Sequence, residues 1–180
     1  MSQLRIFTDT DPATPLVDTT DPALIQAQLH AVGIQFEQWH ASAPLTADST
    51  AEQILQSYAE PINRLKAQAG YQAVDVISLS AHHPDKVALR QKFLAEHRHS
   101  EDEVRFFVRG QGLFCLHLGD KVYQVLCQQQ DLISVPANTP HWFDMGSQPD
   151  FSAIRLFTNP DGWVANYTGS DIASRFALLP

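Results

Sequence analysis

The stretch EHRHSEDEVRFFVRG, residues 96–110, decides how this sequence is interpreted, because it joins a charged segment to a run of β-forming residues. His97 and His99 are two positions apart, and alternate side chains of a strand point to the same face, so both imidazoles can project into one space. Glu103 begins the next expected strand after a short turn. The stretch is either a charged loop that ends in a strand or part of the ligand set of a metal ion, and its spacing alone leaves both interpretations open.

His141 is a fourth candidate ligand, because it follows the proline-containing turn VPANTP, residues 135–140, where the sheet can fold it back over the first pair. Three imidazoles and a carboxylate suit a first-row divalent metal, and the lack of a thiolate in this set argues against a structural zinc. On an octahedral metal, such a set leaves adjacent positions open for a substrate. The alternative for His141 is an ordinary turn histidine bonded to the backbone.

Arg105 and Phe107 share the face of Glu103 if the strand that begins at residue 103 is regular. A charged arginine on an inward face is costly to bury unless it meets an anion. One interpretation is that Arg105 binds the negative charge of a substrate chelated to the metal. The other is a salt bridge with one of the nearby carboxylates, which are Glu96, Glu101 and Asp102.

The chain after residue 103 consists of short β-forming segments separated by turns, and this texture predicts a sandwich or a small barrel. The six expected strands are EVRFFVR (103–109), LFCLHL (113–118), KVYQVLC (121–127), DLISVP (131–136), HWFDM (141–145) and SAIRLF (152–157).

The first half of the chain is expected to be mainly helical. The patterns predict helices over 22–32, from a Ser49/Glu52 capping box to about 59, over 61–70, and after Asp85 with Val87, Leu89, Phe93 and Leu94 on its apolar face. Short strands are predicted near Ile34–Phe36 and over 73–79. We therefore expect a single α+β, mainly β domain over 1–180, with a helix-rich portion at about 20–95 and barrel strands at about 96–160.

Composition disfavours several classes of function. Twelve basic and 20 acidic residues give a formal net charge of -8, which offers no electrostatic surface for nucleic acid or anionic membranes. No apolar segment has the length of a signal peptide or a membrane span, so we expect a soluble, cytoplasmic protein, and we expect it to be a monomer. Cys115 and Cys127 lie in expected strands without a CxxC spacing and are interpreted as reduced core residues.

The ligand pattern resembles the cupin superfamily. His97, His99, Glu103 and Gly110 match its first motif, and DLISVPANTPH with His141 matches its second. Gln130 and Asn138 stand where cupins usually have glycine, which puts the detailed loop shape in question, although asparagine tolerates positive φ better than most residues. The resemblance implies a cupin-type antiparallel β-barrel, a double-stranded β-helix or jelly roll.

Three longer segments make the resemblance more specific. KFLAEHRHSEDEVRFFVRGQGLF (92–114), DLISVPANTPHWF (131–143) and AIRLFTNPDGW (153–163) resemble the acireductone dioxygenase family in order and spacing, over about 86–167. The resemblance implies an enzyme of methionine salvage that uses Fe(II) or Ni(II), one ion per chain, to oxidise 1,2-dihydroxy-3-keto-5-methylthiopentene with dioxygen. It further implies 2-keto-4-methylthiobutyrate and formate with Fe(II), and methylthiobutyrate, formate and carbon monoxide with Ni(II).

The same resemblance suggests roles around the ligands. Arg105 would stabilise enolate-type charge, and Glu96 and Asp102 would orient a ligand histidine or accept a substrate proton, unless they are simply solvated carboxylates. Candidate walls for the thioether tail of the substrate are Phe107, Phe143 and Trp163. A cupin isomerase or decarboxylase, or a non-catalytic cupin that binds a small molecule, would use the same ligands and is the alternative.

Overall fold

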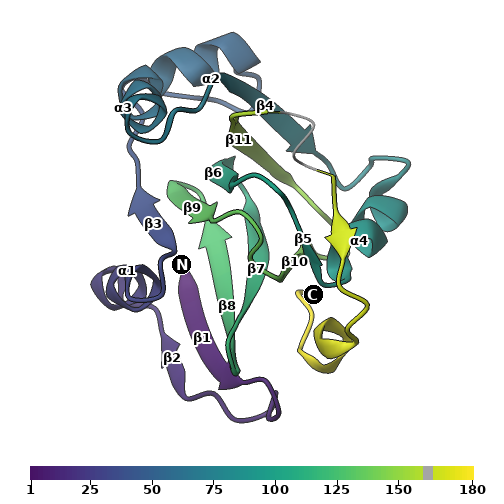
Figure 1. The fold of residues 1–180 in the computed structure, drawn as a ribbon. Coiled ribbons are helices and arrows are strands. Elements are labelled where there is room, and N and C mark those ends of the chain that lie inside the picture. Colours follow the sequence, from purple (N-terminus) through teal and green to yellow (C-terminus); the bar gives the residue numbers. More distant parts are fainter. Residues whose placement is uncertain (160–163) are drawn as a thin grey trace.

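Two antiparallel β-sheets form the body of the molecule (Figure 1). The computed structural model describes residues 1–159 and 164–180. In the seven-stranded sheet the strand order is β12-β5-β10-β7-β8-β1-β2, and in the five-stranded sheet it is β3-β9-β6-β11-β4. The predicted α+β, mainly β fold is therefore confirmed.

The seven-stranded sheet combines the N-terminus with the second half of the chain. Its strands are β1 (Gln3–Thr8), β2 (Val17–Thr19), β5 (His97–Arg98), β7 (Gln111–Leu118), β8 (Lys121–Gln128), β10 (His141–Asp144) and β12 (Asn166–Tyr167). The five-stranded sheet contains β3 (Gln35–Gln38), β4 (Ala73–Leu79), β6 (Glu103–Arg109), β9 (Asp131–Val135) and β11 (Phe151–Phe157). The helices are α1 (Pro22–His30), α2 (Ala51–Ser57), α3 (Ala59–Ala69), α4 (Lys86–Leu94) and the 3-10 helix η2 (Ile172–Arg175).

The main core lies between the two sheets. Leu116 and Val125 come from the seven-stranded sheet, Phe107 and Ile133 come from the five-stranded sheet, and all are at most 1% exposed. Leu29 of α1 joins the same cluster. Because alternate side chains of a strand face opposite ways, the inward face of β6 that carries Phe107 also carries Glu103 and Arg105. The strand that fills the core thus also delivers polar residues to one end of it.

The outer faces of both sheets are covered as well. Val104 and Phe106, on the other face of β6, pack with Tyr58 and Leu65 of the α2–α3 region, which lies beside β4 in Figure 1. On the seven-stranded sheet, Trp142 packs with the C-terminal segment, so β10 is also buried on both faces. Strands buried on both sides have little freedom to move, which favours a rigid frame for the polar end of the core.

Several helix predictions are confirmed with small corrections. Asp21 caps α1 by accepting hydrogen bonds from the backbone N–H groups of Ala23 and Leu24. The capping box of α2 is formed by Thr50 and Gln53 instead of the predicted Ser49 and Glu52. Ser49 instead accepts a hydrogen bond from the backbone N–H of Thr46, so its hydroxyl stabilises the preceding turn.

Other features of the first half were missed or predicted incorrectly. Strands β1 and β2, which precede the predicted helix-rich portion, were not predicted, and β1 pairs along its whole length with β8. In α4, Asp85 makes no side-chain capping bond and Val87 is 66% exposed, although Leu89 and Phe93 pack on the core as expected. No helix in the described ranges is long and apolar enough to cross a bilayer.

Candidate metal centre

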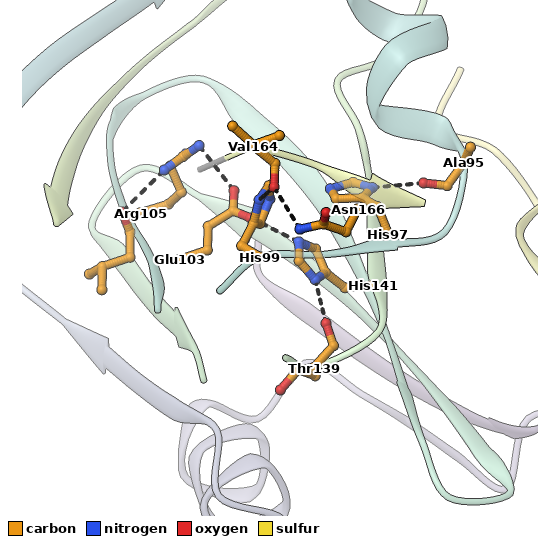
Figure 2. Close-up of polar contacts among 10 residues, drawn as sticks. Ala95, His97, His99, Glu103, Arg105, Thr139, His141, Val164 and Asn166 are labelled. Atoms are coloured by element: carbon orange, nitrogen blue, oxygen red, sulfur yellow. Dashed lines mark hydrogen bonds and ion pairs between the residues drawn. The ribbon is translucent and has the colours of Figure 1, made fainter. Parts of the chain in front are cut away.

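The four predicted ligands converge in one place (Figure 2). One potential ligand atom from each of His97, His99, Glu103 and His141 lies within 4.8 Å of the others, and all four residues are buried. Buried polar groups in such a cluster need partners, and a divalent cation satisfies three imidazoles and a carboxylate at once. The metal-ligand interpretation of residues 96–110 is therefore favoured over the charged-loop interpretation.

Pairing between short strands brings the ligands together. His97 of β5 lies opposite His141 of β10, and their ring centroids are 4.6 Å apart. His99 follows on the same side of the chain, with its ring centroid 5.0 Å from that of His97 and 5.2 Å from that of His141. Glu103 arrives from β6 in the opposite sheet, so the site lies where the two sheets meet.

Two non-glycine residues near His141 have positive φ values. Asn138, which replaces the usual glycine, has φ 63°, and its N–H donates to the carbonyl of His99 at 2.8 Å. Gln130, the other departure, also has a positive φ, of 80°. Both residues thus occupy left-handed conformations that favour glycine, which agrees with their positions in the resemblance.

Each ligand imidazole has one nitrogen held by a backbone carbonyl. The Nδ1 atoms of His97, His99 and His141 lie 2.7, 3.2 and 2.8 Å from the carbonyl oxygens of Ala95, Val164 and Thr139. An Nδ1–H that donates to a carbonyl fixes the tautomer and leaves Nε2 with its lone pair, which is the usual arrangement of metal-bound histidine. The Nε2 atoms of His99 and His141 lie 3.2 and 2.8 Å from Glu103 Oε2, as expected of ligands that surround a common point.

Electrostatics keep most of the cluster ready to bind a cation. Burial alone would raise the pKa of Glu103, but the charge of Arg105 and the hydrogen bonds with His141 and His99 hold it well below its usual range. Burial, with the neighbouring His141, lowers the pKa of His97 to about 4. Burial opposes protonation of His141 too, but its hydrogen bond to Glu103 outweighs this and raises its pKa. At pH values below its raised pKa, His141 holds a proton that must leave before Nε2 can bind a metal.

Arg105 lies on the inward face of β6, as predicted, and pairs with Glu103. Its Nη2 atom is 3.0 Å from Glu103 Oε1, the oxygen that does not face His141, and the arginine side chain is only 14% exposed. The predicted alternative, a salt bridge with Glu96, Glu101 or Asp102, named the wrong carboxylates, because parity places the Glu103 side chain beside Arg105. Arg155 of β11 lies opposite Arg105 in the sheet. It also binds Asp75 of β4, with 2.7 Å between Nε and Oδ1.

Glu96 and Asp102 have partners outside the ligand cluster. Glu96 is 4% exposed, so the solvated-carboxylate alternative was wrong for it, and it contacts His117 and Thr168. Asp102 accepts hydrogen bonds from the Tyr71 hydroxyl and from the Ala137 N–H, both at 2.9 Å. Ala137 belongs to the turn that leads to His141, so Asp102 ties the first ligand motif to the second.

The three candidate wall residues differ in their placement. Phe107 is 1% exposed within the core and packs on Phe114 and Phe151. Phe143 is partly exposed, and it follows His141 by two positions on the inward face of β10, as parity predicted. Trp163 lies outside the described residues. Phe143 is thus more accessible than Phe107.

Some residues at the site were not anticipated. Val164 supplies the carbonyl that holds His99, and Thr168 and His117 bind Glu96, but backbone and long-range contacts of this kind leave no local motif in a sequence. Tyr71 follows α3 directly and reaches Asp102, and burial is the main cause that raises its pKa to about 12. His117 lies outside the ligand cluster, and its Nδ1 is 2.7 Å from Glu96 Oε2.

Known proteins resemble the chain over nearly its whole length. Residues 3–165 match the model of the ARD/ARD' family. The chain is 59% identical to the acireductone dioxygenase of Klebsiella pneumoniae over 99% of both chains, and 60% identical to that of a Synechococcus species over 100% of both. A solved acireductone dioxygenase from Bacillus anthracis, with a cadmium ion in its active centre, matches with a TM-score of 0.81 and 34% identity over 93% of this chain and 98% of the other.

Proposed function

The chain belongs to the ARD/ARD' family of acireductone dioxygenases, and we propose that it binds one Fe(II) or Ni(II) ion at His97, His99, Glu103 and His141. The proposed substrate is the family's acireductone, 1,2-dihydroxy-3-keto-5-methylthiopentene, which is oxidised by dioxygen. With Fe(II), the expected products are 2-keto-4-methylthiobutyrate and formate.

The carbon count corrects the expected Ni(II) product. The acireductone has six carbons, of which formate and carbon monoxide take two, so the remaining acid has four carbons. Methylthiobutyrate has five and does not balance, whereas methylthiopropionate does. We therefore propose methylthiopropionate, formate and carbon monoxide as the Ni(II) products.

One observation carries the proposal of a divalent metal. All three imidazoles direct Nδ1 to backbone carbonyls, and the Nε2 atoms of His99 and His141 meet a single carboxylate oxygen of Glu103. Imidazole and carboxylate ligands without thiolate accept Fe(II) and Ni(II) alike, and such a set leaves positions open on an octahedral ion. When bound, the metal would act as a Lewis acid and a template for the chelating enediol.

Arg105 supports the proposed binding of an anionic substrate. One guanidinium N–H of Arg105 is already engaged with Glu103. Burial lowers the pKa of Arg105, but the guanidinium stays charged because this pKa is very high to begin with. A fixed cation beside the ligand cluster stabilises enolate-type charge without reorganising when the charge develops. We assign Arg105 this role together with the orientation of Glu103.

We propose that Asp102 positions the turn before His141, since both its oxygens are engaged with Tyr71 and Ala137. Phe143 is the proposed wall for the thioether tail, and Phe107 supports it from behind. All four ligands come from one chain, which supports a functional monomer with one metal. Two buried free thiols, Cys115 and Cys127, suit a reducing compartment such as the cytoplasm.

Metal exchange tests the proposed function. The protein is stripped of metal, reloaded separately with Fe(II) or Ni(II), and given the acireductone under oxygen. We expect oxygen uptake and formate with both metals, and carbon monoxide with Ni(II) only. Turnover without oxygen uptake would instead indicate an isomerase or decarboxylase, and binding without turnover would indicate a non-catalytic cupin.

A further inference from the structure

A short exposed segment, residues 164–168, lies along the strand that carries the first two ligands, and we call it the strap. Within it, Asn166 and Tyr167 of β12 lie opposite Arg98 and His97 of β5. The carbonyl of Val164 lies 3.2 Å from His99 Nδ1 (Figure 2), so the strap supplies one of the three carbonyls that orient the ligand imidazoles. The geometry of His99 therefore depends on where the strap is held.

Apolar burial contributes little to holding the strap. Val164 is 66% exposed and Tyr167 is 54% exposed, so the segment gains little from the hydrophobic effect. The Tyr167 hydroxyl donates to the carbonyl of Lys92 at 3.0 Å, which fixes the middle of the strap to the end of α4. The C-terminal end of the strap is fixed by Thr168, and its partner is Glu96.

Glu96 holds Thr168 through both its backbone and its side chain. The Thr168 N–H donates to the Glu96 carbonyl at 3.1 Å, and the Thr168 hydroxyl donates to Glu96 Oε1 at 2.6 Å. The other carboxylate oxygen, Oε2, lies 2.7 Å from His117 Nδ1 on β7. A buried carboxylate with both oxygens engaged is held firmly, and bonds to a charged acceptor are stronger than neutral ones.

His117 in turn connects Glu96 to the second ligand motif. The His117 backbone N–H donates to the carbonyl of Pro140 at 2.9 Å, immediately before His141. The Glu96 side chain therefore joins the strap to the strand beside His141, while its own backbone leads into His97. Because neighbouring residues of a strand face opposite ways, Glu96 points away from the space into which His97 projects.

We propose that Glu96 is a positioning residue whose carboxylate fixes the strap through Thr168, so that the Val164 carbonyl holds His99 with Nε2 directed at the metal. Glu96 thus acts on a ligand through the strap, and its engaged oxygens leave it no role as the proton acceptor for the substrate. The inference rests on the metal site of the proposed function, but not on the identity of the reaction.

Thr168 offers the cleanest test, because replacing the buried Glu96 can disturb folding. Thr168→Val keeps the shape of the side chain and the β-pairing of the strap but removes the hydroxyl that binds Glu96. Thr168→Ser keeps the hydroxyl. Thr46→Val is the matched control, since Thr46 is exposed and its hydroxyl lies 3.4 Å from the Ser49 hydroxyl, in a part of the chain far from the strap in sequence.

Two measurements on the folded, metal-free proteins decide the outcome. The first is Ni(II) affinity by competition with a chelator, where Thr168→Val should bind about 10-fold more weakly, as expected when an outer partner of a ligand histidine is lost. The second is amide hydrogen exchange, which should be about 10-fold faster in the strap and unchanged elsewhere. Thr168→Ser and Thr46→Val should match the parent protein in both.

The proposal is overturned if Thr168→Val binds Ni(II) as the parent protein does, or binds it more weakly with unchanged exchange in the strap. It is also overturned if Thr168→Ser or Thr46→Val loses as much affinity as Thr168→Val. A merely structural role for the hydroxyl would lower thermal stability while leaving the Ni(II) affinity intact. Because neither measurement uses the acireductone, failure of this proposal is distinguishable from failure of the proposed reaction.

Discussion

Arg105 and Glu103 form an ion pair on one face of β6, with 3.0 Å between Nη2 and Oε1. The other carboxylate oxygen, Oε2, faces His141 and His99. A single side chain thus divides its two oxygens between the metal position and a buried cation. This arrangement makes Arg105 the residue that connects ligand geometry to the charge available for a substrate.

Removal of the Arg105 charge should impair turnover far more than metal binding. We expect Arg105→Ala to lower kcat/KM by about 10²–10³-fold, since a preorganised charge at the reacting group is lost. Arg105→Lys, which keeps the charge without the planar fork, should recover part of the loss. Steady-state kinetics with Ni(II)-loaded protein, together with elemental analysis of bound metal, provide the measurement. Wild-type turnover in Arg105→Ala, or loss of its metal under saturating Ni(II), would contradict the assigned role.

Metal binding should release a proton from His141. Because the pKa of His141 is raised above 6.5 in the metal-free protein, a proton is still bound just above this pH and must leave before Nε2 binds metal. The apparent affinity for Ni(II) should therefore increase as the pH rises through the pKa of His141, and it should be weaker at pH values below that pKa. Glu103 and His97 add little, since the pKa of Glu103 is well below its usual range and that of His97 is about 4. Calorimetry in buffers of different ionisation enthalpy measures the release, and the absence of proton release at pH 6.5 would refute the assignment.

Gly112 should be intolerant of a side chain. A Cβ at this position would lie 2.4 Å from ring atoms of Phe143 and 3.2 Å from Phe107. We expect Gly112→Ala to lower the free energy of unfolding by about 1–3 kcal/mol, as overpacking does, and to raise KM by displacing the Phe143 ring. Chemical denaturation and kinetics measure the two effects. Destabilisation with an unchanged KM would exclude Phe143 as a wall of the substrate site.

Replacement of Gln130 by glycine should stabilise the protein. Its φ of 80° is unfavourable for a side chain, while its backbone N–H and carbonyl bond to Phe107 and Trp39 and would remain in place. Gln130→Gly should therefore raise the free energy of unfolding, by up to about 1 kcal/mol after the added entropy of the unfolded chain is included. Denaturant midpoints test this, and a clear loss of stability would show that the Gln130 side chain makes a contribution that outweighs the strain.

Parity and spacing predicted the centre of the site well. Alternation along a strand correctly placed Glu103, Arg105 and Phe107 on one face. Because this face lies against the core, the pairing register of the strand cannot shift by one residue. His97 and His141 were matched by motif, and their approach follows from pairing of β5 with β10. These features are local, or they are set by the burial of one face.

Long-range contacts could not be predicted in the same way. Strand β1 exists because it pairs with β8, whose residues are more than a hundred positions away, and its own sequence shows only a short alternation. The partners of Glu96 depend on the strap and on β7, neither of which is adjacent in sequence. The shift of the capping box from Ser49 to Thr50 is a shift of one residue between overlapping local patterns, and helix ends are the least certain part of a sequence-based prediction.

Anomalous diffraction from crystals of the Ni(II)-loaded protein would locate the metal and identify its ligands. We expect one strong nickel peak per chain, about 2.1 Å from the Nε2 atoms of His97, His99 and His141 and from an oxygen of Glu103. A peak bound by other residues, or one from which any of these four ligands is absent, would contradict this expectation.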